Sequence, residues 1–417
     1  MSCMRPLVRR GWPLLAIIAV ALAACRGSSQ SASPRSTTAG TATATATATT
    51  TGVSSNEILI GSSFALSGPA ASFAVITKAE QAYFDWVNAQ GGVYGRKIKF
   101  IVRDDQYNPA QTVSVVHRLV TEDGVFAVFS SLGTPTGQAV LGYLNEQKVP
   151  FVFVASAASL FNNPRAYPLT FGFAPTYAWE GAFEARYYLD HLAGKKVGIL
   201  YQNDDFGKEY LDSFLKAVGS GAPIVSQQGY EATATDVGSQ IAALRQAGAQ
   251  VVIIYALPSF AAKALKDIHN SGWQPTILMA SVSADPLVIG AVGPAASNGV
   301  ITMGYMPLAS DGANESVQFL GEILAKYAAG TPVTNWTLDG LARAELLVHA
   351  LKRAGPDLTR ARFIDALQSI KDYKFAPLAP ATITSNDHTA LHCLQPMRVE
   401  NGQFSYFGAQ YCQSPAP

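Results

Sequence analysis

The stretch RKIKFIVRDDQYNPAQTVSVVHRLV, residues 96–120, predicts a strand that runs directly into a helix. Its first part, KIKFIV, is dense in β-branched and aromatic side chains, as strands are. Asn108 and Pro109 then suit the N-cap and the first position of a helix that continues to about Val120. A strand followed at once by a capped helix is the repeating unit of folds in which helices cover a parallel sheet.

The same unit recurs along the chain in two series. The first begins with the strand EILIGSSF at residue 57 and reaches the strand PFVFVA at residues 150–155. The second begins with KKVGILY at residues 195–201 and reaches TILMAS at residues 276–281. Because short connections between alternating strands and helices favour parallel neighbours, we expect an α/β protein with two doubly wound parallel-sheet lobes.

Two loops of small and hydroxylated residues follow neighbouring strands of the first series. In SSLGTPTGQ, residues 130–138, Thr134 is placed as an N-cap before a helix, and VASAASL, residues 154–160, carries Ser156 and Ser159. Ligands of such sheets gather at the carboxyl ends of the strands, where helix starts favour negative charge. The loops therefore suit a carboxylate, although the same hydroxyls could merely cap a helix and line a turn.

The N-terminus has the layout of a secretory signal. A basic start (Arg5, Arg9 and Arg10) precedes the apolar residues 12–24, which as a helix of roughly 20 Å are too short for a bilayer core of roughly 30 Å. Leu22-Ala23-Ala24-Cys25 resembles the lipobox of bacterial lipoproteins, in which the cysteine is acylated after cleavage. We expect residues 1–24 to be a signal peptide and residues 25–55 to be a lipidated Cys25 on a disordered tether rich in Ser, Thr and Ala.

Composition and cysteine usage narrow the function classes. Removal of residues 1–24 takes away three arginines and no acid, which leaves 27 basic and 29 acidic residues, so no basic excess points to nucleic acid or anionic lipid. The cysteines that remain beside Cys25 are Cys393 and Cys412, on either side of a hairpin signal at Asn401-Gly402. In an exported protein they are expected to form a disulfide, and the alternative is two buried thiols.

Four segments resemble the leucine/isoleucine/valine-binding protein family, the amino-acid receptors of ABC transporters. They are GSSFALSGPAASFA (61–74), NAQGGVYGRKIKFIVRDDQYNPAQT (88–112), SSLGTPTGQA (130–139) and YQNDDFGKEY (201–210). The resemblance implies a type I periplasmic binding fold, in which three crossovers join two lobes that close on a ligand. It places residues 56–175 and 307–382 in lobe 1, and residues 176–306 and 383–417 in lobe 2.

The resemblance also implies a ligand site. Its carboxylate part maps onto first-lobe hydroxyls and amides, an aromatic ring lies over the ligand, and a second-lobe glutamate that binds the amine is replaced by serine. Asp205 or Asp285 is the possible substitute partner for an amine. The residues expected to bind ligand are Phe73, Leu132, Thr134, Ala157, Ala158, Ser159, Phe206 and Ser281.

The resemblance implies a monomeric, extracytoplasmic substrate-binding lipoprotein of an ABC importer. It would be anchored to the cell membrane, face the periplasm or cell exterior, and deliver a small carboxylate, such as a branched-chain amino acid, to a permease. The alternatives are a ligand that is an aromatic or keto acid or an amide, a sensing module for a membrane receptor, and an extracellular hydrolase. No cofactor, metal or catalytic residue is predicted. The histidines and cysteines show no metal-binding spacing, and the Ser213-x-x-Lys216 motif lacks the partner motifs of acyl enzymes.

Overall fold

The computed structural model describes residues 50–415. The predicted signal peptide, Cys25 and most of the predicted tether lie outside these residues. Among the described residues, no helix combines the length and the apolar character needed to cross a membrane.

The first strand–helix unit of the sequence is confirmed. Strand β2 runs from Lys97–Asp104, and helix α2 runs from Pro109–Thr121. The side chain of Asn108 accepts hydrogen bonds from the backbone N–H groups of Ala110 and Gln111, so it caps α2 as predicted. Local chemistry therefore fixes where this strand ends and where the helix begins.

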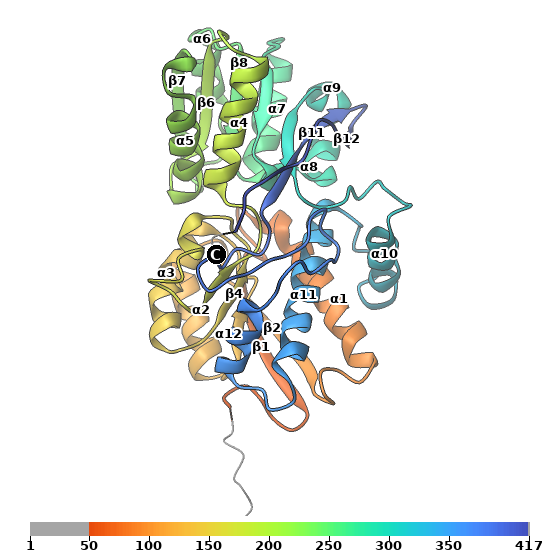
Figure 1. Ribbon diagram of the computed structural model, residues 1–417. Coiled ribbons are helices and arrows are strands. Elements are labelled where there is room, and N and C mark those ends of the chain that lie inside the picture. Colours follow the sequence, from red (N-terminus) through yellow and green to blue (C-terminus); the bar gives the residue numbers. More distant parts are fainter. Residues whose placement is uncertain (1–49, 416–417) are drawn as a thin grey trace, which may run out of the picture. The chain divides into compact units, whose positions relative to one another are not determined.

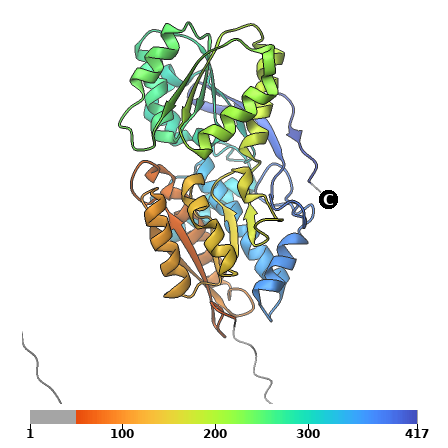
Figure 2. The same cartoon turned by 90° about the vertical axis from the view of Figure 1, so that its left-hand side faces the viewer.

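The first lobe contains a five-stranded sheet in the order β2-β1-β3-β4-β5, with every pair parallel. Helices lie on both faces of this sheet (Figure 2), with α2 packed on α3 and α1 packed on α10 and α11. The other strands are β1 (Glu57–Phe64), β3 (Ala127–Phe129), β4 (Phe151–Val154) and β5 (Thr170–Gly172), and the other helices are α1 (Val75–Ala89), α3 (Thr134–Glu146), α10 (Glu315–Tyr327), α11 (Asn335–Ala354) and α12 (Arg360–Gln368).

The second lobe contains an eight-stranded sheet in the order β12-β11-β10-β9-β8-β6-β7, with β13 also paired to β11. Strands β6 to β10 are mutually parallel, while β11 and β12 join as antiparallel strands. The strands are β6 (Val197–Gln202), β7 (Ile224–Tyr230), β8 (Val251–Tyr255), β9 (Thr276–Met279), β10 (Ile301–Gly304), β11 (Cys393–Glu400), β12 (Gln403–Tyr406) and β13 (Tyr411–Cys412), and the helices are α4 (Tyr177–His191), α5 (Asp205–Val218), α6 (Gly238–Gln246), α7 (Pro258–Asn270), α8 (Pro286–Val292) and α9 (Pro294–Ser297).

The chain passes between the lobes three times (Figure 1). It leaves the first sheet after β5, returns after β10 to add α10–α12 to the first lobe, and re-enters the second sheet as β11. The segment before β11 still contacts the first lobe. Thr389 forms an isolated β-bridge with Gly172, and the His388 ring stacks on the ring of Phe171. Each lobe is therefore built from separate segments of the chain, and three connections join the two lobes.

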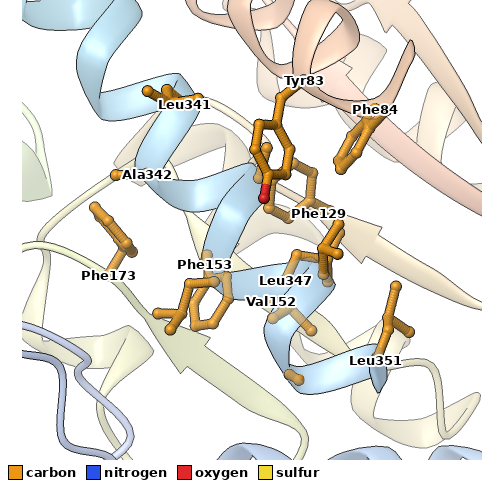
Figure 3. Close-up of a cluster of buried hydrophobic side chains, with 14 of the residues drawn as sticks. Tyr83, Phe84, Phe129, Val152, Phe153, Phe173, Leu341, Ala342, Leu347 and Leu351 are labelled. Carbon is orange, nitrogen blue, oxygen red and sulfur yellow. The ribbon is translucent and has the colours of Figure 1, made fainter. Parts of the chain in front are cut away.

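The core of the first lobe is formed by residues far apart in the sequence (Figure 3). Tyr83 and Phe84 of α1 pack with Phe129 and Phe153 of the sheet, and Leu347 of α11 belongs to the same cluster. The rings of Phe84 and Phe129 lie 5.8 Å apart in an edge-to-face arrangement. The late helix α11 is thus an integral part of the first lobe rather than an addition to its surface.

The predicted C-terminal disulfide is confirmed. Strands β11 and β12 turn at Asn401 and Gly402, which both have positive φ, and β13 brings Cys412 opposite Cys393. The two cysteines are bonded, and they enclose a segment with a sequence separation of 19. The link ties the end of the described chain to the strand that enters the second sheet.

Candidate ligand-binding site

A cavity with a volume of about 100 Å³ lies between the two lobes. Many of its lining residues directly follow strands: Leu132 follows β3, Leu257 follows β8 and Ser281 follows β9. One water molecule needs about 10–15 Å³ on this measure, so the cavity has room for a ligand of several heavy atoms. Its position is the one that parallel sheets offer to ligands.

The structure brings six of the eight predicted ligand-binding residues together around this cavity. Ala158 and Ser159 do not line it. The six that do are Phe73, Leu132, Thr134, Ala157, Phe206 and Ser281.

Aromatic and thioether side chains form much of the cavity wall. The rings of Phe73 and Trp336 are 4.7 Å apart, and those of Tyr177 and Phe206 are 5.3 Å apart. Several further wall residues were not predicted, because they come from late segments of the chain that carry no local signal of a site. These are Met303, Tyr305, Met306, Trp336, Met397 and Tyr406.

Thr134 does not cap helix α3, so that part of the prediction was wrong. The N-cap is Gly133, whose φ of +105° favours glycine, and a Cβ there would come within 2.5 Å of the Tyr107 ring. The Thr134 hydroxyl instead lies 2.7 Å from the Ser156 hydroxyl, and both residues line the cavity. The two predicted loops therefore meet through their hydroxyls at the start of α3.

Ser159 is engaged by a carboxylate of the other lobe. Its backbone N–H donates to both oxygens of Glu209 on α5, at 3.0 and 3.1 Å, and its hydroxyl donates to the same group at 2.5 Å. Burial raises the pKa of Glu209, while the hydrogen bonds from Ser159 oppose that rise. The groups expected to hold a ligand carboxylate at Ser159 thus hold a carboxylate of the protein itself.

Ser281 also forms hydrogen bonds with a buried carboxylate, which was not predicted from the sequence. Glu180 of α4 accepts the Ser281 backbone N–H at 2.7 Å, the Ser281 hydroxyl at 2.6 Å and the Tyr210 hydroxyl at 2.8 Å. Glu180 is only 1% exposed, and burial raises its pKa to about 6. The carboxylate of Glu180 therefore lies directly behind Ser281, although the residue at position 281 is itself a serine.

A charged pair from α11 forms part of the first-lobe wall. Asp339 accepts a hydrogen bond from Arg343 Nε at 2.6 Å and another from the Tyr305 hydroxyl at 3.0 Å. Arg343 also donates to the carbonyl oxygens of Phe153 and Val154 at 2.7 and 2.8 Å. Because each charge is already matched, this wall presents little net charge to a ligand.

The two acids considered as substitute amine partners do not line the cavity. Asp285 caps α8 by accepting from the Leu287 N–H and also accepts from the Trp336 N–H, each at 2.9 Å, and its burial raises its pKa to about 6. Asp205 is exposed in the first turn of α5, where the neighbouring Asp204 is the cap. Asp285 therefore joins two helices, and Asp205 faces away from the site.

Comparisons with known proteins agree with this architecture. A model of the family described as "Periplasmic binding protein" matches residues 57–403. The Leu/Ile/Val-binding protein homolog 3 of Brucella melitensis is 24% identical over 324 residues, which are 77% of this chain and 85% of the relative.

Solved structures share the fold. A branched-chain amino acid ABC transporter protein from Thermus thermophilus with bound valine is 21% identical and has a TM-score of 0.77, over 86% of this chain and 98% of the other. A fatty acid ABC transporter substrate-binding protein from Thermomonospora curvata is 24% identical and has a TM-score of 0.79, over 87% and 94%. With the family match and the two-lobed architecture together, the chain belongs to the periplasmic binding protein family, in its type I group that includes the leucine/isoleucine/valine-binding proteins.

Proposed function

We propose that this protein is the substrate-binding lipoprotein of an ABC importer and that its cavity holds a small carboxylate with an apolar or aromatic body. A branched-chain or related amino acid is the first candidate. The names of the Brucella relative and of the valine-bound Thermus protein support this choice. The residues assigned to the ligand are the six predicted ligand-binding residues that line the cavity.

One observation carries the proposal of an apolar body. Polar side chains of the wall already have partners inside the protein: the Tyr406 hydroxyl donates to Met306 O at 2.6 Å, Trp336 Nε1 donates to Val282 O at 3.2 Å, and Tyr305 donates to Asp339. The remaining wall is largely aromatic, aliphatic or thioether. A ligand with many polar groups would lose water there without gaining hydrogen bonds.

The Thr134–Ser156 pair is assigned to the carboxylate. Ser156 also forms a hydrogen bond with the hydroxyl of Tyr177, so three hydroxyls share two hydrogen bonds and one of their three protons remains for a further acceptor. The pair lies at the first turn of α3, where the helix dipole favours negative charge. This end of the cavity is therefore suited to an anionic head.

An acid without an α-amine is the second candidate. It is favoured because Asp339, the carboxylate in the wall, is bonded to Arg343 and Tyr305 instead of being open to an ammonium group. The name of the Thermomonospora protein supports a ligand of this kind. Binding measurements with paired probes separate the two candidates.

The test of the site uses the full-length chain purified in detergent. A ligand present at 100 times its dissociation constant should add about 2.7 kcal/mol to stability. Ala157→Phe should fill part of the cavity and abolish that gain, while the exposed Ala139→Phe on α3 should preserve it. If neutral amides bind better than every carboxylate tested, the assignment of Thr134 and Ser156 to a carboxylate is wrong.

The lipoprotein part of the proposal rests on Cys25 and the signal that precedes it. Acyl chains contribute about 0.8 kcal/mol per buried CH₂ group, so two or more of them hold a protein firmly at a membrane. Cys25→Ala should release the protein or block its processing. A variant that is processed and still sediments with membranes would contradict this anchor. Permease and ATPase genes beside the gene for this chain would favour transport over sensing.

A further inference from the structure

The hydrogen bonds around Glu180 fix the polarity of one side of the cavity. The carboxylate lies in the first turn of α4 and accepts from both the backbone N–H and the hydroxyl of Ser281. A third donor, the Tyr210 hydroxyl, reaches the same group at 2.8 Å. Three donors converge on one buried carboxyl group, and two of them belong to Ser281, a residue of the cavity wall.

This arrangement determines what Ser281 can offer to a ligand. An ionised carboxylate only accepts hydrogen bonds, and a serine hydroxyl has a single proton. Because the Ser281 proton is directed to Glu180, the oxygen has only lone pairs left for the cavity. A ligand group that meets Ser281 must therefore donate.

The first-lobe side of the cavity has the opposite polarity. There the linked hydroxyls of Thr134, Ser156 and Tyr177 keep one proton for an acceptor such as a carboxylate oxygen. Asp339 already accepts three hydrogen bonds, two from Arg343 and one from the Tyr305 hydroxyl, and Arg343 matches its charge. Ser281 and Glu180 thus form the part of the site that can distinguish a donor from an acceptor beside the ligand's apolar body.

We infer that Glu180, acting through Ser281, selects a ligand that carries a hydrogen-bond donor, an ammonium or a hydroxyl. In the first candidate class, the amino acids, that donor lies on the carbon next to the carboxylate. Glu180 is a positioning residue, because it does not line the cavity. The inference rests on the proposed function, in which the cavity binds a small apolar carboxylate. It predicts rejection of the corresponding 2-oxo and unsubstituted acids, since each would leave the Ser281 oxygen without a donor.

Calorimetry on the full-length chain tests the inference with two sets of four probes. The aliphatic set is L-leucine, 2-hydroxy-4-methylpentanoate, 4-methyl-2-oxopentanoate and 4-methylpentanoate. The aromatic set is L-phenylalanine, phenyllactate, phenylpyruvate and 3-phenylpropanoate. The tightest donor-bearing probe should bind about 10- to 150-fold more tightly than the oxo and unsubstituted members of its set.

Two variants and one matched control separate selection from general damage. Glu180→Gln and Ser281→Ala should each reduce that ratio to within about threefold. A purely structural loss would instead weaken all four members of a set alike and leave the ratio unchanged. Ser281→Ala also serves if Glu180→Gln does not fold. Asp190→Asn, which removes an exposed acid from the same helix, should leave the ratio unchanged.

Several results would overturn the inference. An unchanged ratio in both variants would do so, as would oxo or unsubstituted acids binding as tightly as the donor-bearing probes. If those acids bind best and Ala157→Phe abolishes their binding, the proposed function stands and only the role of Glu180 is wrong. If none of the eight probes binds, the proposed ligand class is wrong and the inference fails with it.

Discussion

The contact between Glu209 and Ser159 should help to hold the two lobes together even without ligand. Ser159 lies between β4 and β5 of the first sheet, while Glu209 lies on α5 of the second lobe. Two donors of Ser159 reach the same carboxylate, at distances between 2.5 and 3.1 Å. Hydrogen bonds to a charged group contribute about 1.5–3 kcal/mol each, but the burial that raises the pKa of Glu209 offsets part of that sum.

A net contribution of about 2–3 kcal/mol corresponds to a change of about 30- to 150-fold in the ratio of joined to separated lobes. Glu209→Gln keeps the shape of the side chain and removes its charge, so the separated form should become more populated by that factor. Distances between spin labels at Gln147 and Gln246, two exposed positions on different lobes, would report the two populations in ligand-free protein.

The matched control is Asp212→Asn, which removes an exposed acid from the same helix and should leave the distances unchanged. Ser159→Ala should act like Glu209→Gln, and the double variant should be no worse than the stronger single one, because both changes remove the same contact. Distance distributions identical to those of the unmodified protein in both single variants would refute the reasoning.

Three further predictions concern the site, the disulfide and pH. Thr134→Ala should weaken ligand binding by about 10- to 150-fold in calorimetry, while the exposed Thr121→Ala should not, and equal binding by both would contradict the carboxylate assignment. Opening the Cys393–Cys412 bond by Cys393→Ser with Cys412→Ser should lower the free energy of unfolding by about 3 kcal/mol in denaturant titrations, since it frees a loop with a sequence separation of 19, and a loss below about 1 kcal/mol would show that the bond adds little. Burial raises the pKa of Asp285 to about 6 and that of Glu345 to about 7, so the folded state holds these protons more tightly than the unfolded state and its stability should fall as pH rises through 5 to 7. The melting temperature should therefore be higher at pH 5 than at pH 7.5, with a smaller difference in Asp285→Asn, and a melting temperature that rises steadily across this range would contradict the assignment.

Most of the fold was predictable because its signals are local. Asn108 and Pro109 mark a helix start within two residues, and Asn401-Gly402 marks a hairpin turn in the same way. Such signals do not depend on where the rest of the chain lies. They also placed the loops that carry Thr134 and Ser156 at one end of the first sheet, although the hydroxyl of Thr134 turned to Ser156 instead of capping its own helix.

The partners within the site could not be predicted in the same way. Glu180 and Ser281 are 101 residues apart, and Ser159 and Glu209 are 50 apart, so no spacing rule joins them. Buried carboxylates on an otherwise amphipathic helix look in sequence like ordinary solvated positions. Only the packing of α4 against the end of β9 shows that Glu180 faces a residue of the cavity wall.

The position of β11 and β12 has a consequence for the order in which the protein becomes functional. Met397 and Tyr406 lie on these strands and form part of the cavity wall, yet the chain reaches them only after all twelve α-helices of the described part. A polypeptide emerges from the ribosome, and from an export channel, with its N-terminus first. The cavity is therefore completed last, so a nascent chain should not capture ligand before its final strands have formed.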